Sequence, residues 1–483
     1  MLNEELAFTP ATELIELIST KQVSPVELTE LYLNRIDRLD SQLNSYLLLT
    51  RDDAMRTARA AERAVVRGEE LGALHGLPIA IKDTQMTKGV RTTYGSLLFK
   101  DRIPERDSTV VKRVRDAGAI MLGKTNVPEF GFSGTCENRL GEHGRNPWNP
   151  DHTPGGSSGG SAAAMAACLC PLATGGDGGG SIRIPASFCG IYGIKPTQGR
   201  VSGYSGLNVA AMPNTFTQPG PLSRTVRDSA LLLQVLSGHD PMDPTSLRVT
   251  PPNFLAAVDK EIKGLRIAWS PDYGFATVDP EILEVTSKAA RVFEELGCHV
   301  EQPDLVLDPP IIPHDKNPVY DAFGPLAHSD SYAAYGSYLE SHGEQMTYFA
   351  RDHIERGARV TGVEYARALG RVNTLKARMD DLFQEYDLLL SPTMYYTALP
   401  ISEFTDDHPD WTEYPHRYVN GTFTLPINAI GHPAANVPAG FSSSGLPIGL
   451  HIVGRRGAEE TVLTASAAFE RARPWIQHRP PVS

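Results

Sequence analysis

The sequence has few of the features that secreted, membrane-bound or nucleic-acid-binding proteins need. Only five of its 483 residues are cysteines, an odd number without a Cys-x-x-Cys pair, which argues against a disulfide framework. No run reaches the ~18 apolar residues that a membrane helix requires, and residues 1–6 lack the basic start of a signal peptide. The formal net charge is −12 and no basic patch with interleaved aromatic residues occurs, so nucleic acid is not expected as a partner. We therefore expect a cytoplasmic protein that makes no membrane contact.

Metal-ligand patterns are missing as well. Residues 309–357 carry four histidines, but none of them forms a His-x-His or His-x-x-x-His pair. Histidines in metal sites commonly recur at such short spacings, so we expect neither a metal nor another cofactor. The histidines of this segment are instead expected on the surface or at the rim of a pocket.

Glycine and serine are concentrated in one stretch, residues 154–198. Two glycine-serine clusters, 155–161 and 175–181, flank a short alanine-rich run. Because glycine tolerates positive φ and close approach, main-chain N–H groups in these clusters could face a ligand. The alanine-rich run 162–170 predicts a helix that ends before Pro171. Apolar residues follow the second cluster directly, which argues against a flexible linker.

Two familiar motifs match this region by letter, and the surrounding residues disfavour both. Gly-x-Ser-x-Gly occurs around Ser157 and around Ser158, but the strand that must precede a nucleophile elbow is missing. Residues 118–125 match the P-loop pattern, yet the four loop positions are Ala-Ile-Met-Leu, which predict a buried strand. A phosphate-binding loop would need flexible, glycine-rich residues there.

A serine nucleophile can also be activated without a histidine. No histidine lies between His152 and His239, so this region offers no imidazole. A lysine can serve as the base if burial lowers its pKa from about 10.4 toward neutrality. The apolar run 76–83 predicts a strand that ends at Lys82. The alternative for Lys82 is an ordinary surface lysine at the end of a strand.

Three segments in order, GLPIAIKD, PGGSSGGS and GGDGGGSIRIPASFCGIYGIKPT, resemble the amidase signature family. The C-terminal segment NAIGHPAANVPAGFSSSGLPIGLHIVGRR also resembles the end of that family's domain. The resemblance implies one large α/β domain with a central mixed sheet flanked by helices. Residues 1–70 would form N-terminal helices, 71–200 the catalytic core, and 309–357 a variable insert that shapes the pocket.

The resemblance also implies the catalytic residues. Ser181, which precedes Ile-Arg, corresponds to the nucleophile of the family. Ser157, preceded by a cis peptide bond, corresponds to the bridging serine, and Lys82 corresponds to the base. We therefore expect the proton of Ser181 to pass through Ser157 to a neutral Lys82.

Further residues are expected to complete the site. The main chain of Gly178, Gly179 and Gly180 up to the nucleophile is expected to form the oxyanion hole. By the same resemblance, Gly131 is expected on the wall of the acyl pocket, and Asp177 and Arg183 are expected to form an ion pair that holds the turn. Ser158 is expected to support the loop.

The predicted function is hydrolysis of the C–N bond of a small-molecule amide through an acyl-enzyme. Many family members read Gly-Thr-Asp-Thr-Gly-Gly-Ser where this chain has Gly176 and Gly178, a departure that resembles the branch acting on linear, cyclic or aryl amides. Carbamates and esters remain open as substrates. The alternatives are a glutaminase subunit that passes ammonia to a partner in a tRNA-dependent amidotransferase, and a binding protein without catalysis on the same fold. The N-terminal helices could also carry a homodimer contact.

Overall fold

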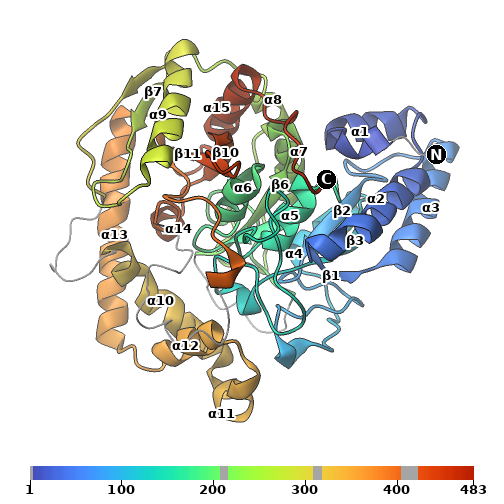
Figure 1. The fold of residues 1–483 in the computed structure, drawn as a ribbon, viewed down its shortest axis with the longest axis horizontal. Coiled ribbons are helices and arrows are strands. Elements are labelled where there is room, and N and C mark those ends of the chain that lie inside the picture. The colour runs from blue at the N-terminus through green and yellow to red at the C-terminus, as the bar shows by residue number, and fades with distance from the viewer. Residues whose placement is uncertain (1–3, 207–215, 308–317, 404–421) are drawn as a thin grey trace.

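The computed structural model describes residues 4–206, 216–307, 318–403 and 422–483 (Figure 1). One mixed sheet of 11 strands runs through this part of the chain in the order β1-β3-β2-β4-β6-β5-β10-β11-β9-β7-β8. In chain order the strands are β1 (Tyr46–Leu49), β2 (Pro78–Lys82), β3 (Ile120–Thr125), β4 (Ala173–Asp177), β5 (Tyr192–Lys195), β6 (Gln218–Ser223), β7 (Arg266–Trp269), β8 (His299–Glu301), β9 (Leu388–Pro392), β10 (Ala434–Phe441) and β11 (Pro447–Gly454).

Helices surround this sheet, as Figure 1 shows. They are α1 (Ala11–Ser19), α2 (Pro25–Leu39), α3 (Arg51–Arg67), α4 (Thr109–Asp116), α5 (Gly159–Ala166), α6 (Arg183–Cys189), α7 (Val226–Leu236), α8 (Phe254–Ala257), α9 (Pro280–Glu295), α10 (Pro318–Tyr335), α11 (Leu339–His342), α12 (Tyr348–Gly357), α13 (Gly362–Glu385), α14 (Leu425–Ile430) and α15 (Glu459–Ala472). The predicted α/β fold with a mixed sheet flanked by helices is confirmed.

Local sequence signals account for several element boundaries. Ser24 caps α2 as the start of a capping box: its hydroxyl accepts from Glu27 N–H while Glu27 reaches back to the cap. The hairpin predicted near the C-terminus is formed by β10 and β11, which pair antiparallel. In the described part of the chain, no helix is both long and apolar enough to traverse a bilayer.

The alanine-rich helix begins earlier than its alanines predicted. α5 starts at Gly159 inside the first glycine-serine cluster and ends at Ala166, rather than running from 162 to 170. Tertiary contacts explain the glycines: a Cβ at Gly160 would lie 2.3 Å from Asn126 N and 2.4 Å from Ser45 O. The first turn of α5 is therefore pressed against the end of β3, where only glycine fits.

The insert predicted at residues 309–357 is helical where the structure describes it. α10, α11 and α12 gather at the lower edge of the molecule in Figure 1, next to the long helix α13. Residues 308–317 lie outside the described part of the chain, so the beginning of this insert is not placed.

The P-loop match at residues 118–125 forms β3, a buried strand parallel to β2. Lys124 is 0 % exposed, and its ammonium donates hydrogen bonds to Gln85 O, Thr87 Oγ1 and Thr92 Oγ1. These three acceptors bind the N–H groups of the Lys124 amine inside the protein, and Asp83 Oδ1 lies 3.8 Å from Lys124 Nζ. No phosphate could reach this lysine without unfolding the strand.

We therefore expect the purified protein to show no heat of ATP binding in isothermal titration calorimetry. Buried Lys124 presents no N–H group to solvent, and the strand around it offers no loop of free main-chain N–H groups. A tight ATP complex that Lys124→Ala abolishes, while circular dichroism shows an intact fold, would contradict this assignment.

Candidate active site

Lys82 is the last residue of β2, and its side chain is only 2 % exposed. Its Nζ lies 2.8 Å from Ser157 Oγ, 2.9 Å from Ser158 Oγ and 3.1 Å from Gly176 O. The ladder between β2 and β4 is limited to Ala80 and Ala173, so no main-chain ladder bond joins the two strands at Lys82. The main-chain N–H of Lys82 donates to Thr174 Oγ1 at 3.1 Å instead of to a strand carbonyl.

Burial lowers the pKa of Lys82 from 10.5 to about 7, although the Asp177 carboxylate pulls that pKa upward. The neighbouring Asp83 does not oppose the shift, because adjacent strand residues point to opposite faces. Asp83 instead accepts from Thr93 and lies near Lys124 on the other face. The predicted depression of the Lys82 pKa is confirmed, so a large fraction of this amine is neutral near pH 7.

Ser157 lies between β3 and α5, and the peptide bond joining Gly156 to Ser157 is cis, as expected. The side chain of Ser157 is buried against Lys82, while the following residue, Ser158, also contacts the lysine amine. The N–H of Ser158 donates to Ser181 O at 3.1 Å, which brings the two glycine-serine clusters side by side. The structure thus unites Lys82, Ser157 and Ser181 at one place.

Ser181 occupies the turn between β4 and α6 and is partly exposed. Its hydroxyl has no hydrogen-bond partner among the described residues, including Ser157. The Lys82–Ser157 bond is therefore formed in this structure, whereas the Ser157–Ser181 bond is not.

The glycines before Ser181 do not all offer a free N–H. The N–H of Gly180 donates to Asp177 Oδ1 at 2.8 Å, so this group points into the protein. Within the described residues, the N–H groups of Gly178, Gly179 and Ser181 have no partner. Of the predicted oxyanion donors, these three are available in this structure and Gly180 is not.

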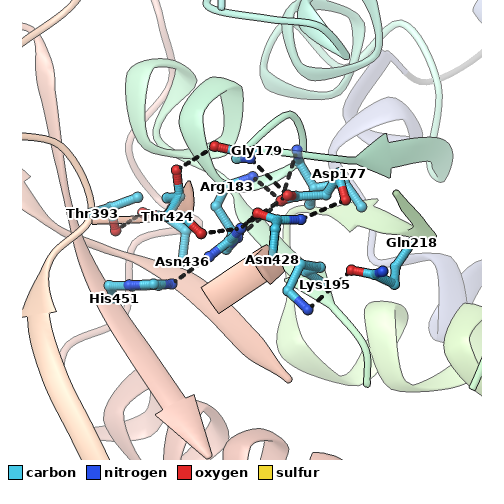
Figure 2. Close-up of polar contacts among 12 residues, drawn as sticks. Asp177, Gly179, Arg183, Lys195, Gln218, Thr393, Thr424, Asn428, Asn436 and His451 are labelled. Atoms are coloured by element: carbon cyan, nitrogen blue, oxygen red, sulfur yellow. Dashed lines mark hydrogen bonds and ion pairs between the residues drawn. The ribbon is translucent and has the colours of Figure 1, made fainter. Parts of the chain in front are cut away.

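Gly180 is needed at its position for a different reason. It has φ +129, and a Cβ there would lie 2.2 Å from Thr424 Oγ1. Thr424 Oγ1 donates to Gly179 O at 2.7 Å, a contact that holds the loop from the α14 side (Figure 2). The glycine thus lets α14 approach the turn around Ser181 closely.

Asp177 and Arg183 form the expected ion pair, and both are 0 % exposed. Arg183 Nε and Nη2 each lie 2.9 Å from one carboxylate oxygen of Asp177, a bidentate geometry. Burial alone would raise the pKa of Asp177, but the guanidinium of Arg183 outweighs it and holds that pKa well below its usual range. The pair spans the turn that carries Ser181, from the end of β4 to the start of α6.

Asn428 and His451 complete this network, and the sequence reasoning missed both (Figure 2). Asn428 Oδ1 accepts from Arg183, and its amide donates to Asp177 O at 2.7 Å and to Phe216 O at 3.0 Å. The pKa of His451 is far below its ordinary value because of burial and the adjacent Arg183, so its Nε2 accepts from the guanidinium at 2.9 Å. Asn428 opens the C-terminal segment quoted above, which was the only available signal.

Gly131, expected on a pocket wall, lies directly beside Ser157. A Cβ at Gly131 would be 3.3 Å from Ser157 Oγ, and its φ is +75.

No group of three or more His, Cys, Asp or Glu in the described residues could hold a metal ion. All five cysteines are buried and unpaired. The thiol of Cys189 donates to Pro154 O, and burial raises its pKa well above the ordinary value, which disfavours a second, thiolate nucleophile.

Replacing Arg183 by methionine is expected to destabilise the protein by roughly 3–5 kcal/mol, because it leaves the Asp177 carboxylate buried without its partner. Urea-induced unfolding measures the effect. The matched control is Arg473→Met at the exposed pair with Glu295, where little change is expected. Equal unfolding midpoints for the two variants would contradict a structural role of the buried pair.

Comparison with known proteins shows which protein family this chain resembles in sequence and structure. The sequence model of the Amidase family matches residues 27–463. The chain is 38 % identical to a glutamyl-tRNA(Gln) amidotransferase subunit from Moorella thermoacetica, over 99 % of both chains. It is 35 % identical to an acylamidase of Rhodococcus erythropolis, over 99 % of this chain and 98 % of that one.

The fold agrees with these matches. A crystal structure of a bacterial aryl acylamidase of the amidase signature family superposes with a TM-score of 0.89, at 35 % identity and 97 % coverage of each chain. The family resemblance derived from three sequence segments is confirmed over nearly the whole length. The chain therefore belongs to the amidase signature family.

Proposed function

We propose that this amidase signature hydrolase cleaves carboxylic amides through an acyl-enzyme on Ser181, with Ser157 and Lys82 as its proton relay. The observation that carries the proposal is the buried amine of Lys82, 2.8 Å from Ser157 Oγ and with a pKa of about 7. A base titrating near neutral pH combines a usable protonation state with sufficient driving force for proton transfer.

The relay transfers a proton from Ser181 to Lys82 when the acyl-enzyme forms, and then from Lys82 to the leaving amine. Ser181 Oγ attacks the amide carbonyl carbon while its proton passes to Ser157, whose own proton passes to Lys82. The tetrahedral intermediate collapses when Lys82, through Ser157, returns a proton to the leaving amine. Water then attacks the ester of Ser181 by the same route and releases the carboxylic acid.

The neighbours of Lys82 orient its lone pair. A neutral amine has two N–H groups and one lone pair, and three oxygens surround it here. When Ser158 Oγ and Gly176 O accept the two N–H groups, the lone pair faces Ser157 Oγ. Ser158 thereby positions the base without taking part in the proton transfer.

The oxyanion would be bound by main-chain N–H groups of the nucleophile turn. Gly178, Gly179 and Ser181 supply candidate donors, and Gly180 is engaged by Asp177. Loss of one such donor costs about 3 kcal/mol of transition-state stabilisation in other hydrolases. Because Asp177 is itself held by Arg183, the turn keeps its shape while charge develops on the carbonyl oxygen.

Aryl or other non-peptide amides are the substrates we favour, with esters or carbamates as further candidates. The acylamidase relative and the superposed aryl acylamidase support this choice. No metal is required by the proposed steps. The unpaired cysteines fit a reducing, cytoplasmic setting, and the homodimer remains a prediction.

A second candidate function is that of a glutaminase subunit in a tRNA-dependent amidotransferase. The 38 % identity to the glutamyl-tRNA(Gln) amidotransferase relative supports it. In that case the acyl-enzyme chemistry would be the same, but the substrate would be glutamine and the released ammonia would pass to a partner protein. A non-catalytic binding protein is disfavoured because Lys82, Ser157 and Ser181 are all present together.

The two candidates differ in what the isolated chain hydrolyses. We expect the purified protein to release 4-nitroaniline from 4-nitroacetanilide without any added protein, and to release no ammonia from L-glutamine. Absorbance and coupled ammonia assays measure the two products, with Ser181→Ala as the inactive control. Glutamine turnover that depends on added amidotransferase subunits, without anilide turnover, would instead favour the second candidate.

Lys82→Met is expected to lower amide turnover by several orders of magnitude, because nothing then accepts the proton from Ser157. In the wild type, kcat/KM should rise with pH through an apparent pKa near 7, as Lys82 loses its proton. Activated esters should retain some turnover in the variant, because their leaving groups need no proton. Near-wild-type anilide turnover by Lys82→Met would remove this lysine from the mechanism.

The same variant has an expected stability signature. The folded pKa of Lys82 lies below the unfolded value of 10.5, so folding releases a proton between about pH 7 and 10.5. Burial of Lys82 lowers the free energy of unfolding of the wild type, and this cost is present in full below pH 7. The cost decreases as pH rises from 7 and is gone above 10.5. Lys82→Met should therefore unfold at no lower urea concentration than wild type at pH 6, and any advantage should shrink by pH 10.

A further inference from the structure

Residues Glu129 to Phe132 form a tight turn beside the catalytic serines, which we name the 129–132 turn. Its first three residues are a short 3-10 helix, with positive φ at Phe130 (φ 54) and at Gly131 (φ 75). Gly131 is the member of this turn that faces the site, since a Cβ there would lie 3.3 Å from Ser157 Oγ. A displacement of the turn would therefore change the space available next to Ser157.

Glu129 ties this turn to the insert helix α12. Its carboxylate is only 1 % exposed and accepts three hydrogen bonds, from Ser96 Oγ at 2.5 Å, Thr347 N–H at 2.5 Å and Thr347 Oγ1 at 2.7 Å. Thr347 is the N-cap residue of α12, yet its hydroxyl makes no bond to the helix it precedes. The hydroxyl donates to Glu129 instead, and the carboxylate lies at the positive end of the helix dipole.

Two ring contacts connect the same turn to the insert. Phe130 stacks on Tyr335, the last residue of α10, with ring centroids 4.3 Å apart and planes at 17°. Phe132 stacks on His353 of α12 at 4.6 Å and 25°, and His353 in turn meets His328 of α10 edge to face at 4.4 Å. Three of the four turn residues thus contact the insert, while Gly131 faces Ser157.

We propose that the 129–132 turn is a clasp through which helices α10 and α12 set the shape of the substrate pocket beside Ser157. In this proposal Glu129, Thr347, Tyr335 and His353 are positioning residues, which influence substrate specificity through the turn. The proposal rests on the amidase function proposed above, because it concerns which substrate groups fit next to the catalytic serines.

The chemistry of Glu129 favours a positioning role over a purely stabilising one. Apolar residues of similar volume could fill a buried site with equal or greater stability, whereas a carboxylate with three donors holds its partners at defined directions. Burial raises the pKa of Glu129 above its ordinary value, and the hydrogen bonds from Ser96 and Thr347 offset only part of this rise. The contact therefore fixes the relative position of two segments that are 218 residues apart in the chain.

Thr347→Val tests the clasp with a minimal change, since valine keeps the shape and removes the hydroxyl. Three anilides that share 4-nitroaniline as leaving group and carry acetyl, butyryl or phenylacetyl groups report on the space beside Ser157. We expect the kcat/KM ratios among them to move about tenfold toward one, mainly through KM, because the released turn discriminates less between acyl groups. Thr347→Ser, which restores the hydroxyl, should recover the wild-type ratios.

Matched variants separate this effect from general destabilisation. Thr286→Val removes a buried hydroxyl in α9 that only contacts its own helix, and it should leave the ratios unchanged. Tyr335→Leu and Glu129→Gln should relax the ratios in the same direction as Thr347→Val. Hydrogen exchange of the first turn of α12 should accelerate in Thr347→Val and Glu129→Gln but not in Thr286→Val.

Unchanged hydrogen exchange in Thr347→Val, or faster exchange with unchanged substrate ratios, would overturn the clasp. If the wild type hydrolyses none of the anilides, the amidase proposal fails while the clasp is still tested. Size-graded sulfonyl fluorides then replace the anilides, because they modify a serine nucleophile without amide turnover. Relative labelling rates that Thr347→Val leaves unchanged would contradict the clasp in that case.

Discussion

A lysine amine buried inside the protein, with its pKa lowered to about 7, constrains the centre of this fold. Removing an ammonium group from water is strongly unfavourable, so burial drives Lys82 toward its neutral form. A neutral amine still needs hydrogen-bond partners, which Ser157, Ser158 and Gly176 provide. The glycines around these serines let two loops and a strand end meet around one nitrogen atom.

The neutral state of Lys82 also depends on the ion pair next to it. Asp177 is the charge that most strongly favours the protonated lysine, and an unpaired carboxylate there would raise the Lys82 pKa further. Arg183 binds both oxygens of Asp177 and offsets its charge. The same pair holds the turn around Ser181, where Asp177 accepts from the Gly180 N–H. One buried contact therefore supports both the lowered pKa of Lys82 and the geometry of the turn.

The site is assembled from segments that the chain brings together over long distances. Lys82 comes from β2, the serines from the starts of α5 and α6, and Asn428 and His451 from α14 and β11. The insert helices reach the same site through the 129–132 turn, whose aromatic and carboxylate contacts connect it to α10 and α12. In the proposed clasp, variation in the insert would alter the space beside Ser157 while the lysine and serines stay in place, as expected where specificity resides in segments attached to a rigid scaffold.

The sequence by itself determined the features that depend on neighbours along the chain. The capping box at Ser24, the hairpin of β10 and β11 and the strand that ends at Lys82 follow from short-range patterns. Three motifs in order also indicated the family, which the comparisons confirm, and predicted Lys82, Ser157 and Ser181 as its catalytic residues. Tertiary structure decided the rest: Arg183 meets His451 across 268 residues, and Thr347 meets Glu129 across 218. Such contacts join side chains that no local periodicity relates, because they arise only when the sheet and its helices pack together.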